Sequence, residues 1–190
     1  MKVKTEEILK FLKNEHTKVL ESKEFKGNYY NYITDTIYLA DKFEDKKSEK
    51  REDIDKSTGR LVMLCHECIH SIQNKYMHIM NIVLSNLSII LIIIAIILKF
   101  CDNINIVFNY ISGCVVLASI VIRLFLENSA IVGSIELLKK VINEKIITNI
   151  STEEIKNAEI YVNENRGKAL LFMIKDKLLM LGILLLISLI

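Results

Sequence analysis

Two long stretches without a charged side chain constrain the fold of this 190-residue chain most strongly. Tyr76 to Leu98 holds 23 residues free of Asp, Glu, Lys and Arg, and Asn103 to Ile122 holds 20. A helix needs about 20 apolar residues to cross about 30 Å of hydrocarbon. We therefore expect residues 76–126 to form an antiparallel transmembrane hairpin with a tight turn at Lys99 to Asn103, rather than two buried helices of a soluble protein.

The composition requires such a division into apolar and charged parts. Hydrophobic residues make up 51% of the chain, although 25% of the residues are charged, which is an ordinary fraction for a soluble protein. These values exclude a disordered or low-complexity chain. The net charge is only +2 and no basic face stands out, so nucleic acid is not an expected partner.

The C-terminal segment is a weaker candidate for a third span. Leu178 to Ile190 holds 13 uncharged residues, which is short for a membrane helix. Residues 169–190 together are long enough, but they place Asp176 between two lysines within the helix. The lysines can extend to the interface, whereas Asp176 needs a partner or water. We predict a third, C-terminal membrane helix over 169–190, with a re-entrant or packed segment as the alternative.

The charges near these spans predict the orientation of the chain. Residues 1–75 and 127–168 must lie on one side of the membrane, because two spans separate them. The other side carries Lys99. The positive-inside rule then places both large segments in the cytoplasm. The basic residues on their side are Lys75, Arg123, Lys139, Lys140 and Lys145.

The charged segments have recognisable local patterns. Met1 to Glu7 lacks the apolar core of a signal peptide, and Thr5 is expected to N-cap a first helix. Asn28 to Ala40 is rich in aromatic and β-branched residues around a Thr-Asp turn, which predicts a β-hairpin. Asp41 to Lys56 is highly charged and is expected to be a solvated loop or exposed helix. From about Ser57 we expect a helix that continues directly into the first membrane span.

That helix carries the motif His66-Glu-Cys-Ile-His70. Positions i and i+4 lie about 40° apart around a helix, so the two imidazoles can share a zinc ion. Glu67 lies on the adjoining face and can act as general base toward a zinc-activated water. The motif predicts a zinc metallopeptidase, and two incidental histidines are the alternative.

Other residue types near this motif are expected to be structural. Cys65 and Cys68 spell C-x-x-C, but on a helix both sulfurs point away from the histidine face. We predict that they pack in the core. His78 lies about 120° off the histidine face and is expected to be an interfacial side chain.

A catalytic zinc site needs a third protein ligand, and the candidates are acidic residues after the second span. Folding the hairpin about residue 102 places residue 136 opposite residue 68, which favours Glu136 when taken literally. Helix tilt and stagger leave the choice open at this point. The four candidates are Glu127, Glu136, Glu144 and Glu159.

Five segments follow one another in an order typical of a known family. They are Tyr30 to Leu39, His66-Glu-Cys-Ile-His-Ser-Ile-Gln73, Asn86-Leu-Ser88, Glu127-Asn-Ser-Ala130 and Asn157-Ala-Glu-Ile-Tyr-Val162. With these segments the chain resembles the YugP-like family of bacterial membrane zinc metallopeptidases, which are distantly similar to the HtpX-type membrane peptidases. The family's metal motif is His-Glu-Val-Gly-His-Ala-x-Gln, and Glu127-Asn-Ser-Ala130 resembles its segment Glu-Phe-Asp-Ala.

The resemblance implies a mainly α membrane protein with a zincin-like metal helix and a small cytoplasmic α+β part. It implies a multi-pass protein of the bacterial cytoplasmic membrane, a protein or peptide substrate, and Glu127 as third zinc ligand with Glu136 as rival. The family's Gly is Ile69 here, its Asp is Ser129, and its usual N-terminal apolar segment is missing. A catalytically inactive, peptidase-like scaffold or interaction protein is therefore the alternative function.

Three further residues are auxiliary candidates. Gln73 lies on the helix stripe of the two histidines, where it can bind substrate, orient a ligand or simply pack. Tyr161 and Arg166 are candidates for steadying an oxyanion. The hairpin near residues 29–39 offers an edge strand that can hold an extended substrate. A site-2-type intramembrane protease is disfavoured, because the chain contains no Asp-Gly.

Overall fold

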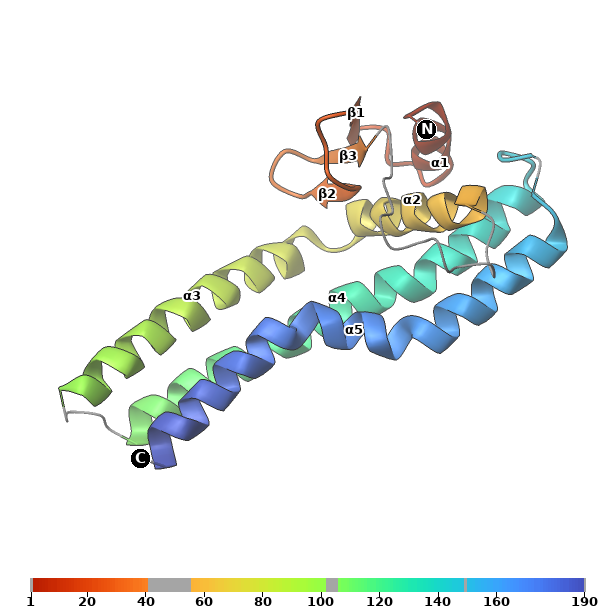
Figure 1. The fold of residues 1–190 in the computed structure, drawn as a ribbon. Coiled ribbons are helices and arrows are strands. Elements are labelled where there is room, and N and C mark those ends of the chain that lie inside the picture. Colours follow the sequence, from red (N-terminus) through yellow and green to blue (C-terminus); the bar gives the residue numbers. More distant parts are fainter. Residues whose placement is uncertain (1, 41–55, 102–105, 149, 190) are drawn as a thin grey trace. The chain divides into compact units, whose positions relative to one another are not determined.

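The protein is mainly helical, with one small sheet (Figure 1). Its computed structural model describes residues 2–40, 56–101, 106–148 and 150–189. Its contacts group the chain into two compact units. The first comprises Met1–Gln73 and Asn128–Arg166, and the second comprises Asn74–Glu127 and Gly167–Ile190. The elements are α1 (Lys2–Phe11), β1 (Lys18–Ser22), β2 (Tyr29–Asn31), β3 (Thr36–Ala40), α2 (Lys56–Ile72), α3 (Lys75–Phe100), α4 (Ile106–Asn143) and α5 (Thr152–Leu189).

The predicted β-hairpin is present in the first unit. Strands β2 and β3 pair antiparallel, with Tyr30 opposite Ile37. The sequence analysis missed β1, which pairs parallel to β3 with Val19 opposite Ile37. The strand order β1-β3-β2 makes β3 central, and this explains why Ile37 is fully buried. The predicted solvated segment at Asp41 to Lys56 lies almost wholly outside the described residues, as does part of the turn at Lys99 to Asn103.

Asp35 ties β1 to the hairpin. Its backbone is left-handed (φ 48°), a conformation that Asp tolerates better than most residues. One carboxylate oxygen accepts hydrogen bonds from the Thr17 hydroxyl at 2.7 Å and the Tyr30 hydroxyl at 2.9 Å. Burial, followed by the nearby Asp35, raises the pKa of Tyr30 above its usual range, so the hydroxyl stays protonated and can donate.

The first helix begins earlier than predicted. Helix α1 starts at Lys2, and Thr5 is fully buried within it, so the prediction of Thr5 as N-cap is wrong. Positions 5, 8 and 9 share one helix face, and all three side chains face the core. The buried core of this unit comprises Ile8, Leu9, Val19, Ile37, Leu39, Leu61, Leu64, Cys65, Cys68, Leu137, Leu138, Val141 and Ile147.

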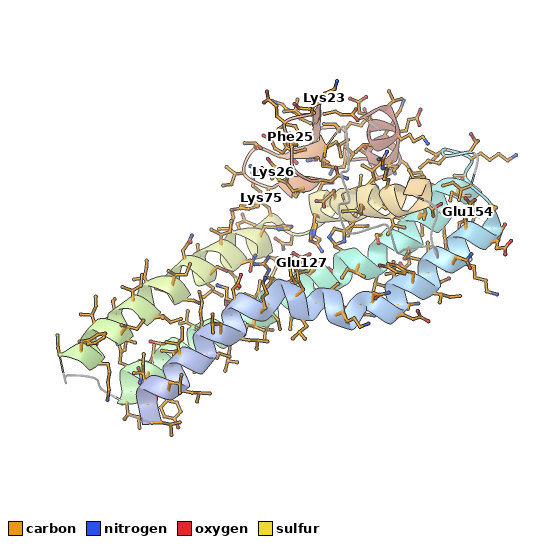
Figure 2. The ribbon with its side chains drawn as sticks, in the orientation of Figure 1. Lys23, Phe25, Lys26, Lys75, Glu127 and Glu154 are labelled. Atoms are coloured by element: carbon orange, nitrogen blue, oxygen red, sulfur yellow. The ribbon has the colours of Figure 1, made fainter. Side chains whose placement is uncertain are left out.

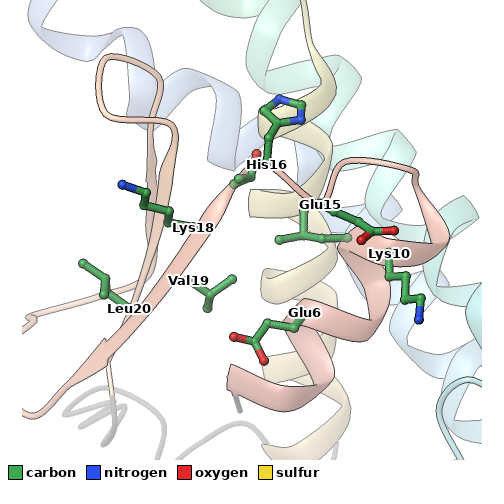
Figure 3. Close-up of a pocket in the computed structure, with 9 residues that line it drawn as sticks. Glu6, Lys10, Glu15, His16, Lys18, Val19 and Leu20 are labelled. Atoms are coloured by element: carbon green, nitrogen blue, oxygen red, sulfur yellow. The ribbon is translucent and has the colours of Figure 1, made fainter.

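A surface groove of about 520 Å³ lies between α1 and β1, where Figure 3 shows the charged side chains around it. Its walls include Glu6, Lys10, Glu15 and Lys18. None of the site residues predicted from the sequence lines this groove. The candidate chemistry of the chain therefore lies elsewhere.

The metal-motif helix does not continue into the first apolar helix, which corrects the predicted fold. Helix α2 ends at Ile72, and α3 begins at Lys75. Between them Asn74 is extended (φ −60°, ψ 116°), and its side chain accepts a hydrogen bond from the Tyr76 amide at 2.9 Å. Asn competes with helical hydrogen bonding in this way and is favoured at N-caps. The boundary between the two units also falls here.

The second unit contains the two predicted apolar helices. Helices α3 and α4 are both long and apolar enough to cross a membrane by length and composition. Their most apolar windows are only 17% and 33% buried, whereas a core helix of a soluble protein is mostly buried. The small core of this unit draws on three helices. It comprises Ile92 and Ala95 of α3, Val116 and Ile120 of α4, and Ile174 and Leu184 of α5.

The last helix is continuous across both units. Ser151 and Glu154 form a capping box, in which the Ser151 amide donates to the Glu154 carboxylate at 2.6 Å and the Glu154 amide donates to the Ser151 hydroxyl at 3.1 Å. From there α5 runs to Leu189, so the predicted segments 127–168 and 169–190 are joined within one helix. The assignment of the predicted segments to cytoplasm or bilayer stays a prediction.

The break between α2 and α3 can be tested at Asn74. Replacing Asn74 by Ala removes the cap, which should cost about 1 kcal/mol and let the first turn of α3 fray. Hydrogen exchange of the Tyr76 amide should accelerate about fivefold. Asn74→Asp keeps the acceptor and should exchange like wild type, whereas unchanged exchange in Asn74→Ala would contradict the role of this cap.

Candidate metal centre

Helix α2 holds the two histidines on one face because its other side is buried. Leu61, Leu64, Cys65 and Cys68 are almost fully buried in the core of the first unit. The i, i+4 spacing then brings the Nε2 atoms of His66 and His70 to 3.0 Å from each other. The rings meet edge to face, with centroids 4.6 Å apart.

This separation fits two ligands of one metal ion. Two nitrogens that bind zinc at about 2.0–2.1 Å in tetrahedral geometry lie about 3.3 Å apart. The observed 3.0 Å differs from that value by a few tenths of an ångström, which small side-chain rotations can supply. Imidazole nitrogen is also a donor that zinc prefers. The pair is suited to zinc in both geometry and donor type.

Glu127 completes a group of three ligand residues. One ligand atom from each of His66, His70 and Glu127 lies within 4.8 Å of the other two. Glu127 lies on α4 (Figure 2), one residue before Asn128, where the first unit resumes. Two imidazoles and one carboxylate are a ligand set typical of catalytic zinc sites.

The rival ligand Glu136 lies apart from this group. It is exposed and follows Glu127 by nine residues, which is half a turn around α4 and about 13 Å along it. The hairpin arithmetic that favoured Glu136 treated α2 and α3 as one helix, and the break at Asn74 invalidates it. Of the other candidates, Glu159 forms an ion pair with Lys139 at 2.7 Å.

Gln73 and Ser129 form a hydrogen-bonded chain behind His70. The Gln73 amide nitrogen lies 2.5 Å from the Ser129 hydroxyl oxygen, to which it donates. The Gln73 amide oxygen lies 2.8 Å from Nδ1 of His70. Because the amide nitrogen is engaged with Ser129, the oxygen must face the histidine, and Nδ1 of His70 must be the donor.

This chain selects the tautomer of His70 that a metal requires. With the proton on Nδ1, the Nε2 atom carries the lone pair that faces His66. Metal-binding histidines almost always donate their second N–H to such a partner. Ser129 stands where the motif that the chain resembles has Asp. It supports His70 through Gln73, an arrangement that the sequence analysis did not anticipate.

A glycine of α4 accommodates Ile69, the other departure from the family motif. A Cβ atom built on Gly133 would lie 3.2–3.3 Å from three side-chain carbons of Ile69, which is tighter than ordinary contact. The larger residue on α2 therefore faces the smallest residue on α4. Ile69 therefore packs where α4 carries no side chain.

Glu67 lies on the same helix as the two histidines. Its side chain is 7% exposed, and His70 beside it is 9% exposed. A carboxylate with so little contact with bulk water is well suited to exchange protons with a bound reactant. The structure thus holds the predicted general base in a protected position on α2.

The two cysteines of α2 are packing residues, as predicted. Both Cys65 and Cys68 are fully buried in the core of the first unit. Burial raises the pKa of Cys65 to about 12 and that of Cys68 well above its usual value, so neither offers a thiolate. His78 lies on α3 in the other unit and is not a member of the metal-binding group.

Arg166 and Tyr161, the oxyanion candidates, lie on α5 within the first unit. Arg166 Nε donates to the Asn128 side-chain oxygen at 2.5 Å, which links α5 to the residue after Glu127. Tyr161 is half-buried, and its carbonyl accepts from Asn165. Arg166 thus steadies the turn that carries the third candidate ligand, while a role toward an oxyanion stays a prediction for both residues.

Comparisons of the chain with protein-family models, with curated proteins and with solved structures gave no match.

The support that Gln73 gives to His70 can be measured. Gln73→Ala removes the acceptor from Nδ1 and should raise the Kd for zinc about 10–100-fold, as loss of such outer partners usually does. Competition with a zinc-binding dye on purified protein measures this constant. Gln73→Glu keeps an acceptor and should bind zinc more tightly than the Ala variant. Equal affinities of wild type and Gln73→Ala would show that this contact does not prepare the site.

The contact between Gly133 and Ile69 can be tested by a double-mutant cycle. Gly133→Ala should destabilise the protein by about 1–3 kcal/mol, because the added methyl group overpacks the α2–α4 contact. In an Ile69→Ala background the same change should cost less, since the obstructing carbons are gone. Denaturant unfolding of all four proteins measures the coupling. Additive effects would contradict this packing.

Proposed function

We propose that this protein is a membrane-embedded, zinc-dependent metallopeptidase that hydrolyses peptide bonds. The observation that carries the proposal is the convergence of His66, His70 and Glu127, with Glu67 beside the first histidine on α2. The resemblance to the YugP-like peptidases supports the same assignment. The three ligand residues would hold Zn²⁺ and leave a position for a small reactant.

Each protein residue has a distinct task in this proposal. His66, His70 and Glu127 would hold the zinc ion, which would supply Lewis acidity for the activation of water. Glu67 accepts the proton of the attacking water and later returns it to the leaving amine. Gln73 keeps His70 in the tautomer that offers Nε2. Arg166 and Tyr161 are proposed to steady developing negative charge.

The sheet suggests how a peptide substrate is held. Strand β2 lies at an edge of the sheet and contacts α2 within the first unit. An extended peptide that adds to the free edge of β2 gains main-chain hydrogen bonds without a demand for a particular sequence. We propose this edge as the substrate strand, because it contacts the helix that carries the metal motif.

We further propose that the protein is a multi-pass protein of a bacterial cytoplasmic membrane. Two helices are long and apolar enough to cross, and the C-terminal part of α5 packs with them as a third. The exposed apolar side chains of α3, such as Ile90 and Ile93, need a covering that hydrocarbon provides. The basic residues beside the spans favour a site that faces the cytoplasm.

Metal content and cleavage together test the proposed function. Detergent-purified wild type should bind about one zinc ion per chain and cleave an unstructured protein substrate such as casein. Glu67→Gln should keep the zinc and lose at least about 10³-fold in cleavage rate, because the proton acceptor is gone. His66→Ala should lose both, since it removes a ligand. Atomic emission and release of labelled peptides are the two measurements.

The outcome separates the peptidase from its rival, a peptidase-shaped scaffold or interaction protein. A scaffold would hold no stoichiometric zinc, and His66→Ala would leave its metal content unchanged. Cleavage that persists in Glu67→Gln at the wild-type rate would overturn the proposed mechanism. Glu136→Gln is the matched control, because Glu136 is exposed and outside the metal-binding group, and it should behave as wild type.

A further inference from the structure

Polar groups from all three helices of the second unit occur amid its apolar side chains. Helix α3 contributes Asn81 and, one turn later, Ser85. Helix α4 contributes Arg123, and α5 contributes Lys177. We refer to these four residues as the basic cluster. A cluster of this kind is expensive beside hydrocarbon, so each polar group requires an explanation.

Lys177 is the most buried member. Its side chain is 5% exposed, and its ammonium donates to the Ser85 carbonyl oxygen at 3.3 Å. An ammonium group has three donors, and a backbone carbonyl carries no full charge to balance it. The contact holds the Lys177 ammonium group beside α3 but does not neutralise its charge.

Arg123 adds a second positive charge to the cluster. It is close enough for its charge to repel that of Lys177. Its Nε atom is buried, and within the described part of the chain no acceptor meets it. On α3, the side-chain oxygen of Asn81 is likewise buried without a donor among the described residues. The cluster thus holds two cations, and the Arg123 Nε donor is buried without an acceptor among the described residues.

The nearby carboxylates do not balance these charges. Asp176 attracts Lys177 electrostatically, but Asp176 is exposed to solvent, whereas Lys177 is buried. Glu127 follows Arg123 by one turn, and its carboxylate belongs to the metal-binding group. Among the described residues, neither cation forms an ion pair. Two cations that form no ion pair at low dielectric favour an anion from outside the chain.

We propose that the basic cluster binds the phosphate group of an anionic membrane lipid. This inference rests on the proposed membrane location, though not on peptidase activity. Arg123 directly follows the uncharged run of α4, and Asn81 lies less than two turns from Lys75 at the start of α3. The cluster therefore lies near the end of the apolar helices, at the level of lipid headgroups. Basic pockets between membrane helices recognise phosphorylated headgroups in this way.

Thermal unfolding of the full-length protein tests this proposal. The protein is purified in a neutral detergent, and its helix content is followed by circular dichroism during heating. Short-chain phosphatidylglycerol at about 100-fold excess over its Kd should raise Tm by about 5–10 °C. Short-chain phosphatidylcholine, whose headgroup carries no net charge, should give no comparable rise. A parallel arm with sodium phosphate distinguishes the lipid from the free anion.

Variants assign the effect to the cluster. Arg123→Gln and Lys177→Met should lose the response to phosphatidylglycerol, and Lys177→Arg should keep it, because Arg also binds phosphate. Lys175→Met is the matched control, since Lys175 lies two residues from Lys177 and is exposed. In phosphatidylcholine, Lys177→Met should have a higher Tm than wild type, because it removes a buried unbalanced charge. The Tm of Lys177→Met in phosphatidylcholine tests the buried charge even if Arg123→Gln fails to fold.

The outcomes divide clearly. A rise in Tm with phosphatidylglycerol alone, lost in Lys177→Met and kept in Lys175→Met, supports a lipid site. An equal rise in Tm with sodium phosphate overturns the proposal of a lipid ligand and identifies free phosphate as the ligand. No rise, or a rise that Lys177→Met retains, overturns the anion site altogether. Glu67→Gln should respond as wild type does, so failure of the peptidase proposal leaves this result unaffected.

Discussion

The packing of α2 against α4 is the contact on which the candidate site depends. Gly133 removes a side chain from α4 where Ile69 of α2 needs the space, and buried Leu137 and Leu138 continue this packing toward the core. The contact fixes the distance between the helix that carries the histidines and the helix that carries Glu127. A methyl group added at this point would require Ile69 or the helices to shift by a few tenths of an ångström.

The polar contacts of the site build on this apolar packing. Gln73 reaches Ser129 across the two helices only because their backbones are held close, and the same amide then fixes the proton of His70. The apolar contact therefore sets the distance between α2 and α4, and the polar chain sets the orientation of one ligand. Ile69 and Ser129 take part in these two kinds of contact, one apolar and one polar.

The second unit presents the opposite balance of forces. Its helices bury few side chains against one another, and most of the apolar surface of α3 is exposed. Apolar burial within the chain therefore contributes less to its stability than in the first unit. Two polar contacts connect its three helices. Lys177 of α5 donates to the Ser85 carbonyl of α3, and Asn109 of α4 donates to the Ser188 hydroxyl of α5 at 3.0 Å. Such contacts gain importance where the surroundings are apolar.

The sequence by itself determined the two apolar helices, the β2–β3 hairpin and the spacing of His66 and His70, because each depends on residues close together in the chain. It could not give β1, which pairs with a strand 18 residues away, or the break at Asn74, where one side-chain hydrogen bond outweighs helix propensity. Residue spacing alone left Glu127 and Glu136 open, the resemblance implied Glu127, and the tertiary structure groups Glu127 with the two histidines. Only the tertiary structure paired Ile69 with Gly133. Those outcomes depend on how far α4 slides along α2, and a shift of two turns leaves the sequence pattern of either helix unchanged.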